Sequence, residues 1–200
     1  MPPMKGKWAQ GIRPRNFAWI ITGRLAVCER PGGYGANHRR VRRQEEIIWI
    51  REQGFTKVIS LIPSSHNLHN YDELGVGWLH RPYRAQDPLR PTLVALLPEL
   101  RALLAAGEQV LVHRDELGDP VQGLVAAFLR WSGVLADGPG AVTVIERLVQ
   151  RQLGPIGREM VEIAGNLPPD LPVPVVPAAV LPVGPDDADV AGEAAAPDVG

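Results

Sequence analysis

"QVLVHRDELGDPVQGLVAAFLRW" spans residues 109–131 and reads as a short apolar strand, a polar loop and an apolar helix. The run of valine and leucine predicts a buried strand that ends at His113, and Pro120 is typical of the first turn of a helix. Where a strand passes through a short loop into a helix, backbone N–H groups converge and the helix dipole adds positive potential. This layout is typical of a site that binds an anion.

The segments around this stretch alternate between expected strands and expected helices. Such alternation predicts an α/β domain in which a central, mostly parallel sheet is flanked by helices. Apolar, β-branched runs bounded by turn residues indicate the strands, and apolar residues at helical spacing indicate the helices. The expected strands lie in residues 17–28 (two strands around a Thr-Gly turn), 55–62, 76–82 and 109–113, and the expected helices in 39–54, 91–107, 120–132, 139–152 and 156–165.

Composition divides the chain into three parts. We expect a flexible N-terminal segment over residues 1–14, a folded domain over 15–166 and a disordered acidic Pro/Ala-rich tail over 167–200. Residues 168–200 contain eight prolines and six acidic residues but no lysine or arginine. A segment of this kind has no aromatic residues and no periodicity, so it cannot bury enough surface to offset the entropy of ordering.

The charge is unevenly distributed along the chain. All 21 basic residues precede residue 168 and face 16 acidic ones there, so the domain has a formal charge of about +5, although the whole chain is at −1. This excess is too small for a dedicated nucleic-acid binder, but it favours anionic ligands or the chain's own tail.

The single cysteine, Cys28, excludes an internal disulfide and a cysteine-based metal site, and we expect it to be a small core residue. The N-terminus has no apolar signal-like region, and no run approaches 18 apolar residues. We therefore expect a soluble, cytoplasmic protein with no membrane contact.

The stretch "VLVHRDELGDPVQGLVAAFL" resembles the signature of the cysteine-dependent tyrosine and dual-specificity phosphatases, V-x-V-H-C-x5-R-[ST]-G-x-x-x-A-x-x-L. His113, Ala126 and Leu129 match it without a gap. The segments "NFAWIITGRLA" (16–26) and "ERPGG" (29–33) are similar to the opening of the small atypical members of this family. The resemblance covers about residues 15–165 and implies their fold.

Four positions depart from that signature. The family's nucleophilic cysteine is replaced by Arg114, which is cationic at every relevant pH and cannot attack phosphorus. The phosphate-gripping arginine is replaced by Pro120, and Val121 and Gln122 replace the hydroxyl residue and the glycine that follow it. Asp87 keeps the spacing of the family's general acid, although an aspartate that closes a loop beside a proline is an equally simple interpretation.

The loop also contains Asp115, Glu116 and Asp119. Asp119 before proline is a favoured helix N-cap, and a carboxylate near a bound phosphate would repel it by roughly 1–4 kcal/mol. One hypothesis is that a loop carboxylate folds into the loop's own anion site and pairs with Arg114. The alternative, that these acids bind a hard cation, matches no calcium-loop spacing.

The basic run "HRRVRR" (38–43) begins the helix expected over 39–54, with Val41 on its apolar face. Positive charge is unfavourable at a helix N-terminus, so we expect other groups to hold it. Arg39, Arg40, Arg42 and Arg43 are candidate binding residues for a phosphorylated or acidic protein. The alternative is a solvated face that pairs with Glu45 and Glu46 or with the acidic tail.

These observations favour a catalytically inactive phosphatase-like protein that acts as a binding or regulatory module. The residues indicate no cofactor and no metal. The alternative is an enzyme with altered, metal-assisted phosphoester chemistry in the same cleft, built from Asp87, His113 and the loop acids.

Overall fold

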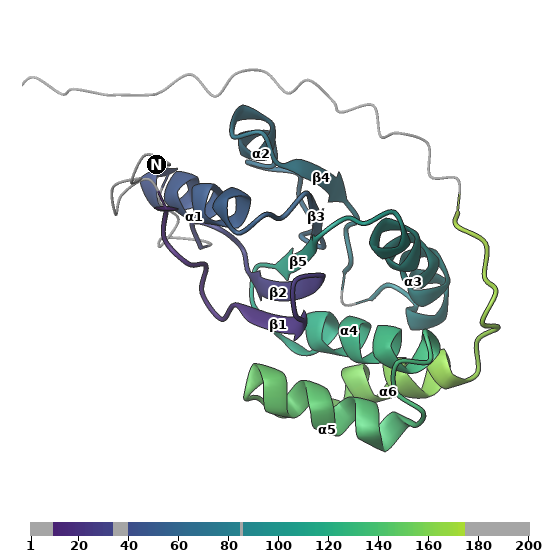
Figure 1. Cartoon of the computed structure of the whole chain (residues 1–200). Coiled ribbons are helices and arrows are strands. Elements are labelled where there is room, and N and C mark those ends of the chain that lie inside the picture. The colour runs from purple at the N-terminus through teal and green to yellow at the C-terminus, as the bar shows by residue number, and fades with distance from the viewer. Residues whose placement is uncertain (1–9, 34–39, 85, 175–200) are drawn as a thin grey trace, which may run out of the picture.

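The computed structural model describes residues 10–33, 40–84 and 86–174 of the 200-residue chain. Within these residues, five strands form one sheet in the order β1-β2-β5-β3-β4 (Figure 1). β1 (Ala18–Ile21) is antiparallel to β2 (Leu25–Glu29), and all other neighbouring strands are parallel. The remaining strands are β3 (Lys57–Ser60), β4 (Gly77–His80) and β5 (Val110–Arg114). The predicted mostly parallel sheet is confirmed.

Helices cover both faces of this sheet, as predicted for an α/β domain (Figure 1). On one face lie α1 (Arg40–Glu52) and the short α2 (His69–Glu73). The opposite face is covered by α3 (Leu89–Ala105), α4 (Asp119–Trp131), α5 (Gly138–Val149) and α6 (Pro155–Gly165).

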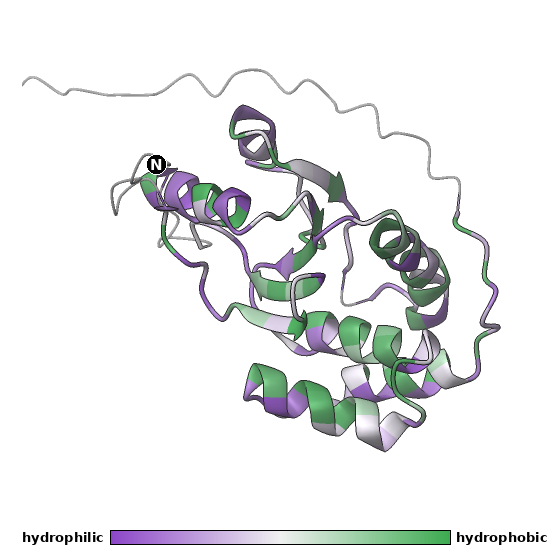
Figure 2. Ribbon diagram, in the orientation of Figure 1, coloured by the Kyte–Doolittle hydropathy of each residue, from purple (hydrophilic) through white to green (hydrophobic). Residues whose placement is uncertain are grey.

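Alternation of side chains along each strand produces two separate cores. In β2, Leu25 and Val27 pack on the side of α3 to α6, whereas Ala26 and Cys28 pack under α1. Successive strand residues point to opposite faces, and both faces are covered, so the strands are apolar throughout. Figure 2 shows this as hydrophobic colour on the strands and on the inner sides of the helices. Cys28 is a buried free thiol, as expected.

α4 is the most buried helix that the structure describes, with ten of its 13 residues buried. It lies between the sheet and α6, so it is apolar on nearly all sides. Its apolar character therefore comes from burial inside the domain. Among the described helices, none combines the length and the hydropathy that crossing a bilayer requires.

Two details of the α1 and α3 regions differ from the prediction. α3 begins at Leu89, two residues before the predicted start. Val41, predicted to lie on the apolar face of α1, is 71% exposed. The inner face of α1 instead carries Arg43, with Glu46, Ile47 and Ile50 at helical spacing below it. The sequence prediction missed this because two of the four inward residues are charged.

The folded domain starts earlier than residue 15. Gly11 packs so closely on α1 that a Cβ atom there would lie 2.3 Å from the carbonyl oxygen of Glu45. The backbone N–H of Ile12 donates to the same carbonyl over 3.1 Å. The predicted flexible segment is thus too long at its C-terminal end; residues 1–9 lie outside the described residues.

The domain also continues beyond residue 167. The indole Nε1 of Trp131 donates to the carbonyl of Pro168 over 2.7 Å. The Arg101 guanidinium lies 4.1 Å from the centre of the Trp131 ring and donates to the carbonyls of Pro169 and Leu171. The predicted start of the disordered tail is therefore wrong for residues 168–171, because an aromatic ring and a guanidinium bind their carbonyls. Residues 175–200 lie outside the part of the chain that the structure describes.

The crossing of α4 and α6 gives a first test of this fold. A methyl group on Gly123 would lie 2.5 Å from the Cα of Gly157, and a backbone atom cannot move aside without displacing its helix. We expect Gly123→Ala to lower the free energy of unfolding by about 2 kcal/mol, measured by urea denaturation followed by tryptophan fluorescence. In the control Gly165→Ala, the added methyl would meet only the Arg130 side chain at 3.4 Å, so stability should not fall. Equal stability of the two variants would contradict the close crossing.

Candidate functional site

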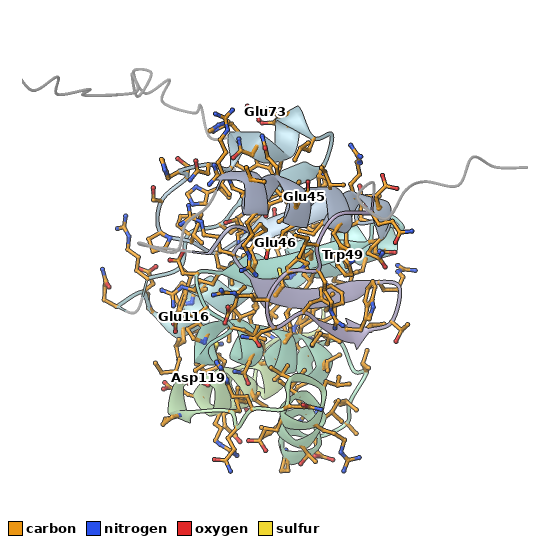
Figure 3. The ribbon with its side chains drawn as sticks, turned by 90° about the vertical axis from the view of Figure 1, so that its left-hand side faces the viewer. Glu45, Glu46, Trp49, Glu73, Glu116 and Asp119 are labelled. Atoms are coloured by element: carbon orange, nitrogen blue, oxygen red, sulfur yellow. The ribbon has the colours of Figure 1, made fainter. Side chains whose placement is uncertain are left out.

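The loop between β5 and α4 lies at the edge of the sheet where the parallel strands end. β2, β5 and β3 are neighbours in the sheet, so their C-terminal ends bring distant segments together there. β5 ends at Arg114, and α4 begins at Asp119 with Gly118 as its N-cap. Figure 3 shows Glu116 and Asp119 on one side of the molecule, with Glu45 and Glu46 of α1 across the sheet from them.

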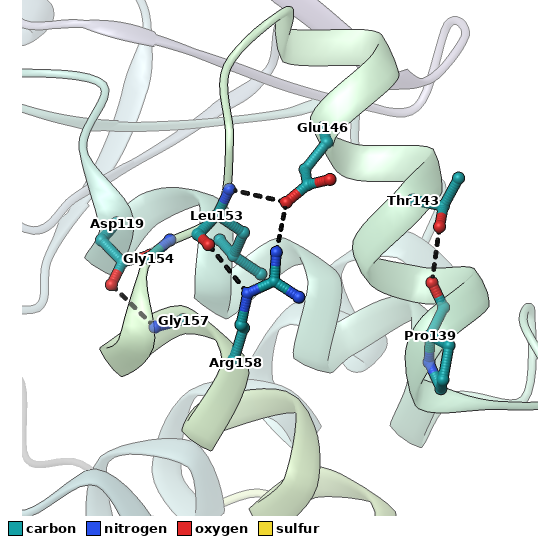
Figure 4. A network of polar contacts seen from close by, with 8 residues as sticks. All are labelled: Asp119, Pro139, Thr143, Glu146, Leu153, Gly154, Gly157 and Arg158. Carbon is teal, nitrogen blue, oxygen red and sulfur yellow. Dashed lines mark hydrogen bonds and ion pairs between the residues drawn. The ribbon is translucent and has the colours of Figure 1, made fainter.

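Asp119 does not cap its own helix, so that prediction is wrong. Its carboxylate accepts hydrogen bonds from the backbone N–H groups of Gly154 and Gly157, over 2.7 and 2.9 Å (Figure 4). These are the N-cap and the third residue of α6, whose first N–H groups have no partner within the helix. A Cβ atom on either glycine would lie 2.8 Å or less from a carboxylate oxygen. Asp119 thus binds the N-terminus of α6 and leaves that of its own helix without a side-chain cap.

Asp115 forms an ion pair, but not with Arg114. Nη1 of Arg30 lies 3.1 Å from Oδ1 of Asp115, and Nη2 of Arg30 donates to the carbonyl of His66 over 2.9 Å. The backbone N–H of Arg30 also donates to the carbonyl of Arg114. Arg30 therefore joins three loops at this edge of the sheet. The sequence analysis missed it, although its place directly after β2, the strand next to β5, is the signal that could have found it.

Arg114 lies at the position after His113 where the family signature has its cysteine. The residue is half-buried, and its guanidinium carbon lies 5.8 Å from the centre of the Tyr83 ring. Its Nε atom is buried without a hydrogen-bond partner among the described residues, and so is the hydroxyl of Tyr83. A guanidinium has no lone pair available for attack on phosphorus, so this position offers no nucleophile.

The residues that replace the rest of the signature are structural. Pro120 lies in the first turn of α4, where its missing N–H costs nothing, and Val121 is fully buried. The amide of Gln122 is buried and donates to the carbonyl of Leu117 over 3.2 Å. Arg151 donates to the same carbonyl over 2.7 Å. The loop is thus held from within α4 and from the segment between α5 and α6.

That segment has its own network (Figure 4). Glu146 of α5 accepts from the backbone N–H of Leu153 over 3.0 Å and from Nη2 of Arg158 over 2.7 Å. Arg158 also donates through Nε to the carbonyl of Leu153. The start of α6 is therefore fixed on one side by Glu146 and on the other by Asp119.

His113 is fully buried, and its Nε2 lies 3.2 Å from the hydroxyl oxygen of Tyr71. Burial, with a contribution from the positive charge of Arg30, lowers the pKa of His113 from 6.5 to about 3. The imidazole is neutral at physiological pH. It lies on the α1 side of the sheet and positions the end of β5.

Asp87 reaches the same edge of the sheet. Its Oδ2 accepts from the backbone N–H of Arg84 over 2.7 Å, and its own N–H donates to the Arg84 carbonyl. The carboxylate thus closes the turn before α3. This contact agrees with the second of the two interpretations, an aspartate that closes a loop.

The predicted basic surface at the start of α1 is not continuous. Arg43 is buried and its Nε donates to Oδ1 of Asn70 over 2.5 Å; burial and the charges of Arg30 and Arg40 lower its pKa. Arg42 pairs with Glu46 over 2.8 Å, as the alternative interpretation expected. Arg40 is exposed, and Arg39 lies outside the described residues.

The three loop carboxylates do not converge. Asp115 binds Arg30, and Asp119 binds the start of α6. Within the described part of the chain, no group of three or more His, Cys, Asp or Glu side chains is arranged to hold a metal ion.

Comparison with known proteins identifies the fold of this chain. No protein-family model matches the sequence, and no curated protein matches it either. Among solved structures, Tk-PTP in its active form is similar with a TM-score of 0.62 and 18% identity, over 76% of this chain and 97% of that one. Kinase associated phosphatase, with its catalytic-site cysteine replaced by serine, gives 0.61 and 17% over 72% and 90%. Human DUSP28 gives 0.58 and 13% over 78% and 97%. The chain has the fold of the dual-specificity and protein tyrosine phosphatases.

The role of Asp119 can be tested by removing the carboxylate oxygens that accept these two hydrogen bonds. We expect Asp119→Ala to lower the free energy of unfolding by about 2 kcal/mol, because two backbone N–H groups at the start of α6 lose their partner. Asp119→Asn keeps an acceptor oxygen and should recover part of that loss. Glu159→Gln, at an exposed position of α6, should change stability by less than about 0.5 kcal/mol in the same urea titrations. A loss no larger for Asp119→Ala than for Glu159→Gln would contradict this role.

Burial of the His113 imidazole should make the free energy of unfolding depend on pH. The unfolded chain protonates this imidazole near pH 6.5 and the folded protein only near pH 3, so the stability is complete above 6.5 and is lost as the pH falls toward 3. Between pH 7.5 and 5 the loss should be about 2 kcal/mol. His113→Asn should remove this slope, whereas His69→Asn, at an exposed position of α2, should keep it. If the unmodified protein, His113→Asn and His69→Asn all lose stability equally between pH 7.5 and 5, His113 does not titrate in this way.

Proposed function

We propose that this protein is a catalytically inactive member of the dual-specificity phosphatase fold that acts as a binding or regulatory module. The observation that carries the proposal is Arg114 at the end of β5, with its guanidinium carbon 5.8 Å from the centre of the Tyr83 ring, where the signature of the active family has its thiolate. Phosphoryl transfer through a covalent intermediate needs a nucleophile at that point.

The electrostatics of the loop support the same proposal. A phosphate dianion is bound in such loops by converging N–H groups and by a bidentate arginine. Here the arginine position is Pro120, and Asp115 and Asp119 add two carboxylates to the neighbourhood. Each carboxylate within about 4 Å of a phosphate charge would cost roughly 1–4 kcal/mol. Arg30 neutralises only one of them directly.

The rival proposal, metal-assisted phosphoester chemistry in the same cleft, finds less support. It needs carboxylates that converge on one cation. Asp115 is paired with Arg30, Asp119 with the start of α6, and Asp87 with the turn before α3. His113 is buried on the other side of the sheet, under α1.

The partner that we propose is a phosphorylated or acidic protein. The domain has an excess of about five positive charges, which favours an anionic partner. The surface next to the loop offers exposed Arg84 and Arg90 at the start of α3, and Arg40 is exposed at the start of α1.

Hydrolysis of para-nitrophenyl phosphate tests the inactivity. The purified full-length protein should give no turnover above background with or without EDTA, and Asp87→Asn should be indistinguishable from it. Turnover that Asp87→Asn abolishes would contradict the proposal and identify Asp87 as a working general acid. Turnover that EDTA abolishes would favour the metal-assisted rival.

A further inference from the structure

A groove runs along the free edge of the sheet at β1, away from the β5–α4 loop. β1 stands at one end of the strand order, so no strand among the described residues pairs with its outer edge (Figure 1). β1 contacts α5, and a groove of about 380 Å³ lies between the strand and the C-terminal turn of that helix. This β1–α5 groove is lined by Arg13 and residues 16–19 on one side and by residues 148–150 on the other. Its volume lies within the range of clefts that hold small ligands, roughly 300–1,000 Å³.

Both walls of the β1–α5 groove offer backbone groups for hydrogen bonding. An edge strand presents alternate N–H and C=O groups on its unpaired side. The last four carbonyls of a helix lack partners within it, and α5 ends at Val149 with Gln150 as its C-cap. An extended chain in the groove could therefore pair with β1 as an added strand and donate to carbonyls at the end of α5.

The rim of the groove is positively charged. Arg13, Arg15 and Arg147 are exposed, and none of them has a carboxylate partner among the residues that the structure describes. Nη2 of Arg13 donates to the carbonyl of Phe17 over 2.9 Å, and its guanidinium carbon lies 5.0 Å from the centre of the Phe17 ring. These contacts hold the Arg13 charge at the groove before any ligand binds, which reduces the entropy lost on binding. No acidic residue is among the described residues that line the groove.

We propose that the β1–α5 groove binds an extended acidic segment of a partner protein, which adds to the sheet as a strand beside β1. This inference rests on the proposed function, because it specifies the surface and the conformation through which the binding module holds its acidic partner. β1 has four residues, so the paired part of the partner is about 13 Å long.

The two faces of β1 indicate which side chains the partner has. Arg13 lies over Phe17, which packs on the α1 side of the sheet. Ala18 packs on the α5 side, where Val149 is partly buried and Leu148 is 40% exposed. Side chains of an added strand alternate between the two faces. The partner segment therefore alternates acidic side chains, which face Arg13, with apolar side chains, which cover Leu148.

A second copy of this chain and the chain's own tail fit the groove less well. Two β1 strands paired about a two-fold axis would bring the same arginines together, and their charges would repel. The tail has an acidic stretch without proline at residues 186–196, but nine of these 11 residues are Asp, Ala or Gly, which are poor strand formers. The prolines before that stretch have no N–H to donate to a strand.

The test is an NMR titration of the full-length protein at pH 7.5 with a capped hexapeptide of alternating glutamate and valine. The backbone amide signals of β1 should shift saturably. A peptide with lysine in place of glutamate should not bind, because the rim would repel it. The glutamate–valine peptide with every backbone nitrogen methylated should bind at least several-fold more weakly, because it cannot donate hydrogen bonds to β1.

Variants of the rim test the charge. Arg13→Gln and Arg147→Gln should each weaken binding of the glutamate–valine peptide by about two- to five-fold, as expected for an exposed ion pair. Arg13→Lys keeps the charge and should retain most of the affinity. The matched control is Arg51→Gln, which removes an exposed charge near β4, at the opposite end of the sheet, and should leave the affinity unchanged.

Three results would overturn the groove as the binding site: no saturable shift in β1, equal binding of the methylated peptide, or equal losses in Arg13→Gln and Arg51→Gln. Two others would overturn the choice of occupant. Signals of β1 that shift on dilution without peptide would assign the groove to a second copy. Peptide affinity that rises several-fold on neutralising the tail would assign it to the tail (D186N, D187N, D189N, E193Q and D198N). None of these results bears on turnover of para-nitrophenyl phosphate, so the proposed inactivity stands or fails separately.

Discussion

The carboxylate of Asp119 holds the loop, α4 and α6 in one arrangement. It is the first residue of α4, and it accepts the backbone N–H groups of Gly154 and Gly157 at the start of α6. The same Gly157 is where α6 touches the backbone of α4 at Gly123. The carboxylate thus fixes the depth at which the two helices cross, and with it the N-terminus of α4, where the loop ends.

The polar groups of the loop are consequently occupied by structure. Asp115 is bound by Arg30, the Leu117 carbonyl by Gln122 and Arg151, and Asp119 by α6. An active phosphatase loop must keep its polar groups directed at the substrate. In this chain, most of them instead connect segments that are far apart in sequence.

The elements of the fold could be predicted from the sequence, because hydrophobic periodicity and turn residues act locally. The strand 109–113 and the helix after Pro120 are examples. The site could be predicted only in part. The resemblance to the signature alone predicts that Arg114 and Pro120 stand where the family has catalytic residues. The partner of Asp119 lies 35 residues away and that of Asp115 lies 85 residues away, so no local pattern identifies them. Finding Arg30 requires the strand order, in which β2 is adjacent to β5.

The proposed inactivity implies that the β5–α4 loop does not accommodate a phosphoryl group in transfer. Orthovanadate resembles the transition state of that reaction, and transition-state analogues bind far more tightly than substrates to sites that catalyse it. Isothermal titration of the full-length protein with orthovanadate is therefore the most direct test. We expect no saturable binding at micromolar concentrations. Micromolar binding that Asp87→Asn weakens would contradict it, because it would mean that the loop still recognises the geometry of phosphoryl transfer.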